Sequence, residues 1–472
     1  MIGFSCNSSF NKYSIIKKMQ LSILFFIANF LYIASASLIG PNKPSEDSFY
    51  TPPKGYENSK PGDILQFRKA PAKLASSFFP IDVKNVWQVL VRSEDSFGNP
   101  NAIVTTIMEP YSADPMKVVS YQTYEDSANI DCSPSYGFLF GANPGTVATQ
   151  TDMPFIVMAL KNGYYVVSPD YEGPKSTFTA GRQSGQAVLN SIRATLNSTD
   201  ITGIDKNAKV AMWGYSGGSL ASSFAAALQP VYAPDLSEHL IGVALGGFVT
   251  NITATAEITD GTPFAGLIPN ALMGLANEYP DFEKNLFAQV SNPIARLALK
   301  NGREYCMIPA MVHYLGRQFF GGLLPVFPKG FGILNNDVIN KVIYGNSMVT
   351  LANEMMPQIP TFIYHGSLDR IVPIVGAKSV YQQWCNNNIA SLEFAEDTTG
   401  GHISETIVGA PAAWTWLEQR FEGKQPVKGC SHDTRASNFL YPGIKPTTLQ
   451  FFQSLYETFL GSPLGPFDDS KF

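Results

Sequence analysis

The segment Gly214–Gly218, with the sequence GYSGG, constrains the fold of this chain more than any other feature. It fits the pattern G-x-S-x-G, which is weak evidence alone because glycine and serine are common. Its flanks make it specific, since the β-prone run Lys209–Met212 precedes it and the small-residue helical pattern Ser219–Ala227 follows it. The alternative is a glycine-rich turn whose serine only caps the helix. A serine on a sharp strand-to-helix turn is typical of a nucleophile, and the pattern predicts that role for Ser216.

The rest of the chain alternates β-prone runs with helical patterns. The other expected strands are Val86–Ser93, Asn101–Met108, Lys117–Thr123, Tyr164–Ser168, Ile241–Leu245, Thr361–Tyr364 and Ser391–Ala395. Helical patterns at Pro154–Asn162 and Ala180–Leu196 lie between them. This alternation predicts an α/β fold with a mostly parallel sheet. Residues 37–80 are polar and Pro-rich, and we expect them to form an N-terminal arm with one helical stretch, Ile64–Ala75.

Residues 247–349 break the alternation, because they are unusually apolar and contain no expected strand. The helical patterns there are Phe264–Leu275, Phe282–Leu299, Ile308–Leu324 and Leu334–Ile343. A helical block inserted between two strands is best interpreted as a cap over the carboxyl edge of the sheet, where ligands bind in open α/β sheets. The alternative is a separate helical domain without a lid role.

The first residues predict the compartment. Three lysines precede the apolar run Leu21–Ile33, which is followed by the small-residue site Ala34–Ala36. This arrangement is typical of a secretory signal peptide cut after Ala36, with Met19 as an alternative start. The run is shorter than the roughly 18–20 residues that span a bilayer, so we expect no transmembrane anchor. The predicted protein is secreted and extracellular.

We therefore expect four segments. They are a signal peptide at 1–36, the first part of the core with its N-terminal arm at 37–246, a helical cap or lid at 247–349, and the second part of the core with a C-terminal flap at 350–472.

Composition excludes several classes of protein. With 45% hydrophobic residues, the chain is not disordered or fibrous. It has 33 Lys and Arg against 38 Asp and Glu and shows no basic stripe, so nucleic-acid binding is not expected.

The cysteines agree with export. Cys6 lies in the predicted leader, which leaves Cys132, Cys306, Cys385 and Cys430. An even number in an oxidising compartment predicts two disulfides, with three possible pairings. Spacing alone favours the pairing of Cys385 with Cys430, and only because this pair closes the shortest loop after the core. A zinc site is the rival interpretation, but the chain has no C-x-x-C pair and no paired-histidine spacing, so no metal is expected.

Two sequons, at Asn197 and Asn251, predict glycosylation sites on the surface of a secreted protein.

A serine nucleophile needs a general base, and the chain has only five histidines. His402 lies in a glycine-containing loop after an expected strand, which is where the base belongs in this kind of fold. Three other histidines are less suited to this role. His239 lies in a polar turn, His313 in the apolar helical block and His432 in the C-terminal loop. His365 ends a strand and is interpreted as a structural histidine.

The base in turn needs a carboxylate to orient it. Asp369 follows the expected strand Thr361–Tyr364, and the Val372–Pro373 pair after it suggests a tight turn. The resulting order of serine, aspartate and histidine along the chain is that of the α/β-hydrolase fold.

Several motifs together resemble the yeast secretory triacylglycerol lipases of the Candida lipase A type. They span about Ser93 to Cys430 and are Tyr124–Ser127, Asp131–Tyr136, Gly163–Ser168, Gly214–Gly218, His365–Pro373 and the loop of His402. The resemblance implies an α/β-hydrolase with a helical lid and a triad of Ser216, Asp369 and His402. It also implies the disulfides Cys132–Cys306 and Cys385–Cys430.

The resemblance further implies an oxyanion hole made by the Gly217 N–H group and Asp126. This pair would replace the HGGG-type loop of other lipases, which the sequence lacks. The position of Asp126 in the sequence does not by itself distinguish it from an ordinary loop carboxylate.

We therefore expect a secreted triacylglycerol lipase that hydrolyses long-chain acylglycerol esters through an acyl-enzyme. It should need no cofactor, act on lipid at oil–water interfaces and be a monomer. One alternative is a secreted carboxylesterase for shorter or non-glyceride esters, and another is a peptidase of the same fold, although the motifs show no acidic group to hold a substrate amine. A non-catalytic binding protein would have lost a triad residue, and all three are present.

Overall fold

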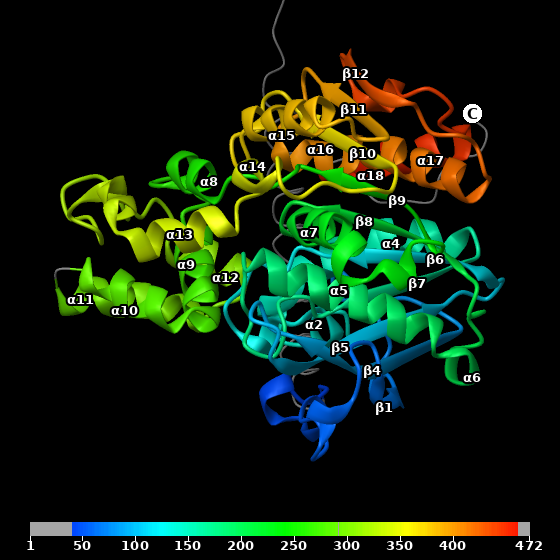
Figure 1. Ribbon diagram of the computed structural model, residues 1–472, viewed down its shortest axis with the longest axis horizontal. Coiled ribbons are helices and arrows are strands. Elements are labelled where there is room, and N and C mark those ends of the chain that lie inside the picture. Colours follow the sequence, from blue (N-terminus) through cyan, green and yellow to red (C-terminus); the bar gives the residue numbers. More distant parts are fainter. Residues whose placement is uncertain (1–39, 291, 461–472) are drawn as a thin grey trace, which may run out of the picture.

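A ten-stranded sheet forms the centre of the molecule in the computed structural model, which describes residues 40–290 and 292–460 (Figure 1). In spatial order the strands are β1 (Ile64–Lys69), β4 (Asn85–Glu94), β5 (Pro100–Glu109), β7 (Tyr164–Pro169), β6 (Asp114–Gln122), β8 (Lys209–Tyr215), β9 (Leu240–Gly246), β10 (Thr361–Gly366), β11 (Ser391–Asp397) and β12 (Gly429–Arg435). The neighbours from β7 to β12 run parallel, and β1, β4 and β5 form an antiparallel edge. The expected α/β fold with a mostly parallel sheet is confirmed. A separate hairpin pairs β2 (Ala75–Ser76) with β3 (Phe79–Pro80).

Two edge strands differ from the expectation. The predicted helix Ile64–Ala75 is wrong, because Ile64–Lys69 forms β1 and pairs with β4. Its partner strand and a small core around Phe49 and Leu90 hold this segment extended, which overrides a weak helical pattern. His432 lies on β12 and not in a loop. That strand, GCSHDTR, lacks the apolar alternation of a half-buried strand and pairs only along one side, with β11.

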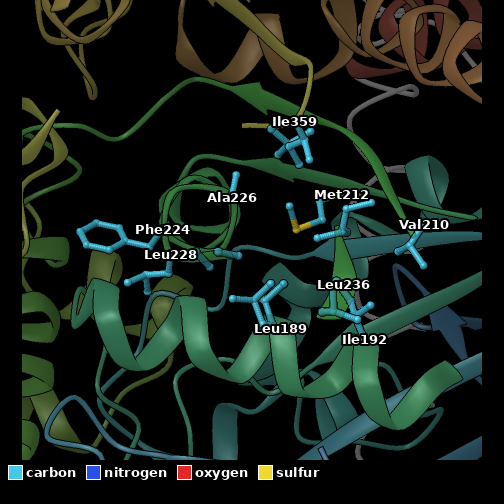
Figure 2. Packing of buried hydrophobic residues seen from close by; sticks show 14 of the residues in the cluster. Leu189, Ile192, Val210, Met212, Phe224, Ala226, Leu228, Leu236 and Ile359 are labelled. Atoms are coloured by element: carbon cyan, nitrogen blue, oxygen red, sulfur yellow. The ribbon is translucent and has the colours of Figure 1, made fainter. Parts of the chain in front are cut away.

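Helices cover both faces of the sheet. One face carries α5 (Gly181–Leu196), α7 (Gly217–Tyr232) and α15 (Ile374–Asn386), and the other carries α4 (Met153–Lys161), α17 (Ala410–Phe421) and α18 (Pro446–Phe459). Side chains of β8 alternate between these two cores, so that Met212 enters the first and Trp213 the second. Figure 2 shows Leu189 and Ile192 of α5 pointing toward Met212. The helices expected around residues 154–162, 180–196 and 219–227 are confirmed as α4, α5 and α7.

Between β9 and β10 the chain forms a helical insertion, which projects beside the sheet (Figure 1). Its helices are α8 (Ile252–Thr259), α9 (Leu267–Glu278), α10 (Pro280–Ala288), α11 (Pro293–Lys300), α12 (Met307–His313), α13 (Asp337–Gly345) and α14 (Met348–Leu351). As expected, the described residues from 247 to 349 contain no strand. The insertion has its own buried core, which includes Leu272, Phe282 and Phe319.

Two long helices expected in the insertion are shorter than predicted. The stretch Phe282–Leu299 is divided into α10 and α11, because Pro293 begins a new helix. The stretch Ile308–Leu324 is α-helical only to His313, and the positive φ angles of Gly316 and Gly322 beyond it prevent one continuous helix. The remaining α-helices of the described chain are α2 (Pro134–Gly137), α3 (Val147–Thr151), α6 (Thr199–Thr202) and α16 (His402–Val408).

Two disulfides tie distant segments together. Cys132–Cys306 joins the segment after β6 to the start of α12 in the insertion, and Cys385–Cys430 joins α15 to β12. These are the pairs that the resemblance implies. Within residues 40–460, no helix has both the length and the apolarity needed to cross a membrane. The predicted signal peptide, residues 1–36, lies outside the described part of the chain.

Candidate active site

Ser216 lies on the turn between β8 and α7 with a strained backbone, at φ 51° and ψ −124°. Two glycines after it allow the turn to pack closely. A Cβ atom at Gly217 would collide with Oδ1 of Asp126, and one at Gly218 would collide with the carbonyl oxygen of Gln122. Gly217 is the first residue of α7, where backbone N–H groups have no acceptor within the helix and the helix dipole favours negative charge. This geometry is that of a nucleophile elbow.

Three predicted side chains form one hydrogen-bonded chain at the carboxyl edge of the sheet. Ser216 Oγ lies 2.9 Å from Nε2 of His402, and Nδ1 of His402 lies 2.6 Å from Oδ2 of Asp369. Ser216 follows β8, Asp369 follows β10 and His402 follows β11, so three separate strands position them. Ser216 is partly accessible, whereas His402 and Asp369 are buried. The arrangement allows a proton to pass from the serine to the histidine while the carboxylate orients the imidazole.

The Asp369 carboxylate is fixed and charged. Its Oδ1 accepts the backbone N–H groups of Ile371 at 2.9 Å and Val372 at 2.7 Å. Although burial opposes ionisation, the neighbouring His402 and His365 side chains hold the pKa of Asp369 well below its usual value. The backbone of His402 is also anchored, because the Tyr215 hydroxyl donates to the His402 carbonyl oxygen at 2.6 Å.

Asp126 has its Oδ1 against Gly217, the residue after Ser216. It adopts a positive φ of 50°, and its carbonyl oxygen accepts the side-chain amide of Asn270, on α9, at 2.9 Å. Burial raises the pKa of Asp126 to about 7. Asp126 and Gly217, the two residues of the implied oxyanion hole, therefore lie next to each other and line the same cavity as Ser216.

Apolar cavities open from Ser216 in two directions. The first runs into the helical insertion between α8, α9 and α13, and its lining includes Ile252, Leu267, Leu272, Phe331, Leu334 and Ile343. The second runs between α12, α16 and α18, and its lining includes Phe264, Met307, Ile308, Met311, Ile403 and Leu455. Both cavities are walled mainly by hydrocarbon, which suits a ligand with long apolar groups on the two sides of a reacting centre.

Sequence reasoning missed a cluster of buried carboxyl groups behind the site. Glu125 and Asp126 follow β6, and Asp170 and Glu172 follow β7. Burial raises the pKa of Asp170 to about 7 and, together with the neighbouring acids, raises those of Glu125 and Glu172 well above their usual values. Acidic residues directly after two adjacent parallel strands were the available signal, because the carboxyl ends of parallel strands share one edge of the sheet.

The other predicted residues have local partners elsewhere. His239 Nδ1 contacts the carbonyl oxygen of Ala208 at 3.0 Å, and His432 Nε2 lies 2.8 Å from Glu396. His313 is exposed and stacks on Tyr305. Of the two sequons, Asn197 is exposed at the end of α5, and Asn251 caps α8 by accepting the Ala254 N–H group.

Comparisons with known proteins identify the family of this chain. The sequence model of the family described as "Secretory lipase" matches residues 139–429. Lipase 1 of Candida albicans is 58% identical over 444 residues, which are 94% of this chain and 94% of that protein. Lipase 2 of the same organism is 55% identical over 443 residues, or 94% of this chain and 95% of that protein.

Solved structures show the same architecture. The crystal structure of Candida antarctica lipase A in its closed state superposes with a TM-score of 0.78 at 28% identity, covering 88% of this chain and 96% of that one. The rice cell wall degrading esterase LipA from Xanthomonas oryzae superposes with a TM-score of 0.58 at 13% identity, covering 78% of this chain and 100% of that one, and this likeness shows the fold alone. The fold is that of the α/β-hydrolase lipases. Since the family match spans more than half of the sequence and close relatives cover nearly all of it, the chain belongs to the secretory lipase family and is a serine ester hydrolase.

Proposed function

We propose that the protein is a triacylglycerol lipase that hydrolyses long-chain acylglycerol esters, with Ser216, His402 and Asp369 as its catalytic triad. The observation that carries this proposal is that the hydrogen-bonded chain of these three side chains opens onto apolar cavities on both sides of the serine. An ester carbonyl at Ser216 would then have apolar space for the acyl chain and for the rest of the glyceride.

The proposed reaction follows from the positions of these groups. Ser216 Oγ attacks the ester carbonyl carbon as His402 Nε2 takes the hydroxyl proton, and the Asp369 carboxylate stabilises the imidazolium that forms. His402 then donates this proton to the leaving alcohol oxygen, which leaves an acyl-enzyme on Ser216. Next, His402 removes a proton from a water molecule that attacks the acyl carbonyl, and it returns that proton to Ser216 as the fatty acid leaves.

The charge that develops on the carbonyl oxygen needs donors beside Ser216. We assign this role to the backbone N–H group of Gly217 and to Asp126, each donor worth about 2.7–4 kcal/mol in comparable sites. The raised pKa of the Asp126 side chain matters here, because an ionised carboxylate beside Gly217 would repel the oxyanion.

We further propose that residues 247–349 act as a cap and residues 350–472 as the second part of the core with its flap. The cavity between α8, α9 and α13 would hold the acyl chain, where each buried methylene contributes about 0.8 kcal/mol. A signal peptide at 1–36 would direct the chain outside the cell, where Asn197 and Asn251 would carry glycans and the enzyme would act as a monomer.

The rim of the second cavity supports action at a lipid surface. Ile308 of α12 and Ile403 of α16 both line this cavity, and both are partly exposed. Next to Ile308, Val312 is 72% exposed and Leu315 is 68% exposed. The segment Met307–Leu315 contains no Lys, Arg, Asp or Glu, so this rim can contact oil without desolvating a full charge.

Activity should therefore rise when a medium-chain glyceride passes its solubility limit, and p-nitrophenyl esters of C12 should be hydrolysed faster than those of C2. The test measures initial rate against glyceride concentration for the unaltered enzyme and for the double variant Val312→Asp and Leu315→Asp. The variant should lose most activity on emulsion and keep activity on dissolved C4 ester, because only docking on oil needs the apolar rim.

Val231→Asp is the matched control, since Val231 is 88% exposed at the end of α7 and does not line either cavity. A hyperbolic curve with no rise at the solubility limit, together with faster hydrolysis of C2 than of C12, would instead support the carboxylesterase alternative.

A further inference from the structure

His365 is completely buried beside the proposed triad and takes no part in the proton transfers described above. It lies on β10, four residues before Asp369. Its Nδ1 lies 3.1 Å from the backbone N of Phe248, and its Nε2 lies 3.0 Å from the carbonyl oxygen of Val372. The same Nε2 lies 3.2 Å from Oδ2 of Asp369.

These contacts determine which ring nitrogen carries the proton. A backbone N–H group can only donate, so Phe248 requires Nδ1 of His365 to be an unprotonated acceptor. The proton of the neutral ring therefore lies on Nε2. That N–H group faces two acceptors, the Val372 carbonyl and the Asp369 carboxylate. The His365 imidazole thus faces Oδ2 of Asp369 with a hydrogen-bond donor, its Nε2–H group.

Oδ2 of Asp369 consequently lies between two imidazoles. His402 Nδ1 approaches it at 2.6 Å and His365 Nε2 at 3.2 Å, while Oδ1 is held by two backbone N–H groups. Both carboxylate oxygens therefore have protein partners that fix their orientation. A carboxylate that turned away would leave the His402 imidazole without its orienting partner.

The other side of His365 reaches the start of the helical insertion. Phe248 follows β9 directly, and its neighbour Val249 donates its N–H group to Ser219 Oγ on α7 at 3.1 Å. Ser219 in turn donates to the carbonyl oxygen of Ser216 at 2.6 Å. The first residues of the insertion, Phe248 and Val249, are therefore hydrogen-bonded to His365 and to the turn that carries Ser216.

We propose that His365 is a positioning residue that holds the Asp369 carboxylate in the orientation that receives the His402 N–H group, through its Nε2–H donor, while Phe248 fixes the ring from the other side. This inference rests on the triad roles proposed above for Asp369 and His402. His365 acts through Asp369 and does not contact the substrate.

Two substitutions separate the two contacts of His365. His365→Gln keeps an N–H donor near the position of Nε2, and His365→Asn keeps an acceptor near the position of Nδ1. His365→Ala removes both, and His239→Ala is the control because His239 lies in a separate turn. The measurement is kcat and KM on a soluble p-nitrophenyl ester, per active site titrated with a phosphonate, beside the melting temperature of each secreted variant.

His365→Ala and His365→Asn should lower kcat by about tenfold or more with KM within about twofold, because they remove a donor to a charged group. His365→Gln should recover most of the lost kcat. If His365→Asn is as fast as the unaltered enzyme, or if His365→Gln is as slow as His365→Asn, the proposal is wrong. The comparison of His365→Asn with His365→Gln tests the proposal even if His365→Ala fails to fold.

Asp369→Asn separates this inference from the function on which it rests. If Asp369→Asn stays active, the proposed triad fails. If Asp369→Asn is inactive while the Asn and Gln variants of His365 are both fully active, only the role of His365 fails.

Discussion

Replacing Ser216 with alanine is expected to lower kcat by about 10⁵–10⁶-fold, the loss typical of a removed serine nucleophile. The fold should survive, because the only side-chain hydrogen bond of Ser216 in the described structure joins it to His402. Alanine keeps the Cβ atom that serine already has, so the substitution adds no atom to the turn. The measurement is the initial rate on p-nitrophenyl esters beside the melting temperature and the yield of secreted protein. His402→Ala should lose activity to a similar degree.

Ser223→Ala is the matched control. Ser223 lies buried on the same helix, α7, and its hydroxyl donates only to the Leu220 carbonyl at 2.9 Å, so removing it should leave kcat nearly unchanged. If Ser216→Ala kept even a few per cent of the activity at the same melting temperature, another residue would have to be the nucleophile.

Stability is expected to fall as the pH rises from about 4 to above 7. In an unfolded chain, aspartate and glutamate have pKa values of about 3.9 and 4.3. Burial raises the pKa to about 7 for three carboxyl groups in the folded protein, which are Asp126, Asp152 and Asp170. Burial and neighbouring acids raise the pKa of Glu125 and Glu172 further.

The sign follows from proton linkage. A carboxyl group whose pKa is raised on folding stabilises the protein fully below its unfolded pKa, and this contribution is lost as the pH rises through the folded pKa. Between about pH 4 and 7 the folded state holds protons that the unfolded chain has released, so each unit of pH lowers the free energy of unfolding. Below pH 4 the protonation of Asp369, whose pKa is lowered, acts in the opposite direction. The protein should therefore be most stable in mildly acidic solution.

Melting temperature measured from pH 4 to 9 tests this expectation. We expect a fall of about 5 °C or more between pH 5 and 9, and Glu125→Gln should make the fall shallower because it removes one buried ionisable group. Glu57→Gln is the control, since Glu57 is exposed on the N-terminal arm. A melting temperature that is constant or higher at pH 9, or an equally steep fall in Glu125→Gln, would show that these carboxyl groups do not control stability.

The site residues that could be predicted from the sequence are those whose position depends only on the residues next to them in the chain. Ser216 lies in a glycine motif between a strand and a helix, and Asp369 and His402 each follow a β-prone run, so their places at strand ends could be read from neighbouring residues. Because parallel strands end at one edge, strand-end residues meet even when they are far apart in the chain. The structure brings these three side chains into one hydrogen-bonded chain.

Features that depend on distant partners could not be predicted in this way. The strand β1 is held extended by β4 and a small core, and the polar strand β12 by β11 and a disulfide, not by their own residue patterns. The interaction of His365 with Asp369 was also missed, although the residues are close in sequence, because it depends on the ring orientation that Phe248 imposes. The pKa shifts of the carboxyl cluster depend on complete burial by neighbouring elements.

Covalent trapping tests the central claim most directly, namely that Ser216 attacks a long-chain acyl ester. The enzyme would be treated with a p-nitrophenyl phosphonate that carries a long alkyl chain, and the release of p-nitrophenol would be followed together with the mass of the protein and of its peptides. We predict one adduct per molecule, on the peptide that contains Ser216, with complete loss of activity and no adduct in Ser216→Ala. A stoichiometric adduct on a different residue, or full activity after Ser216 is modified, would contradict the account.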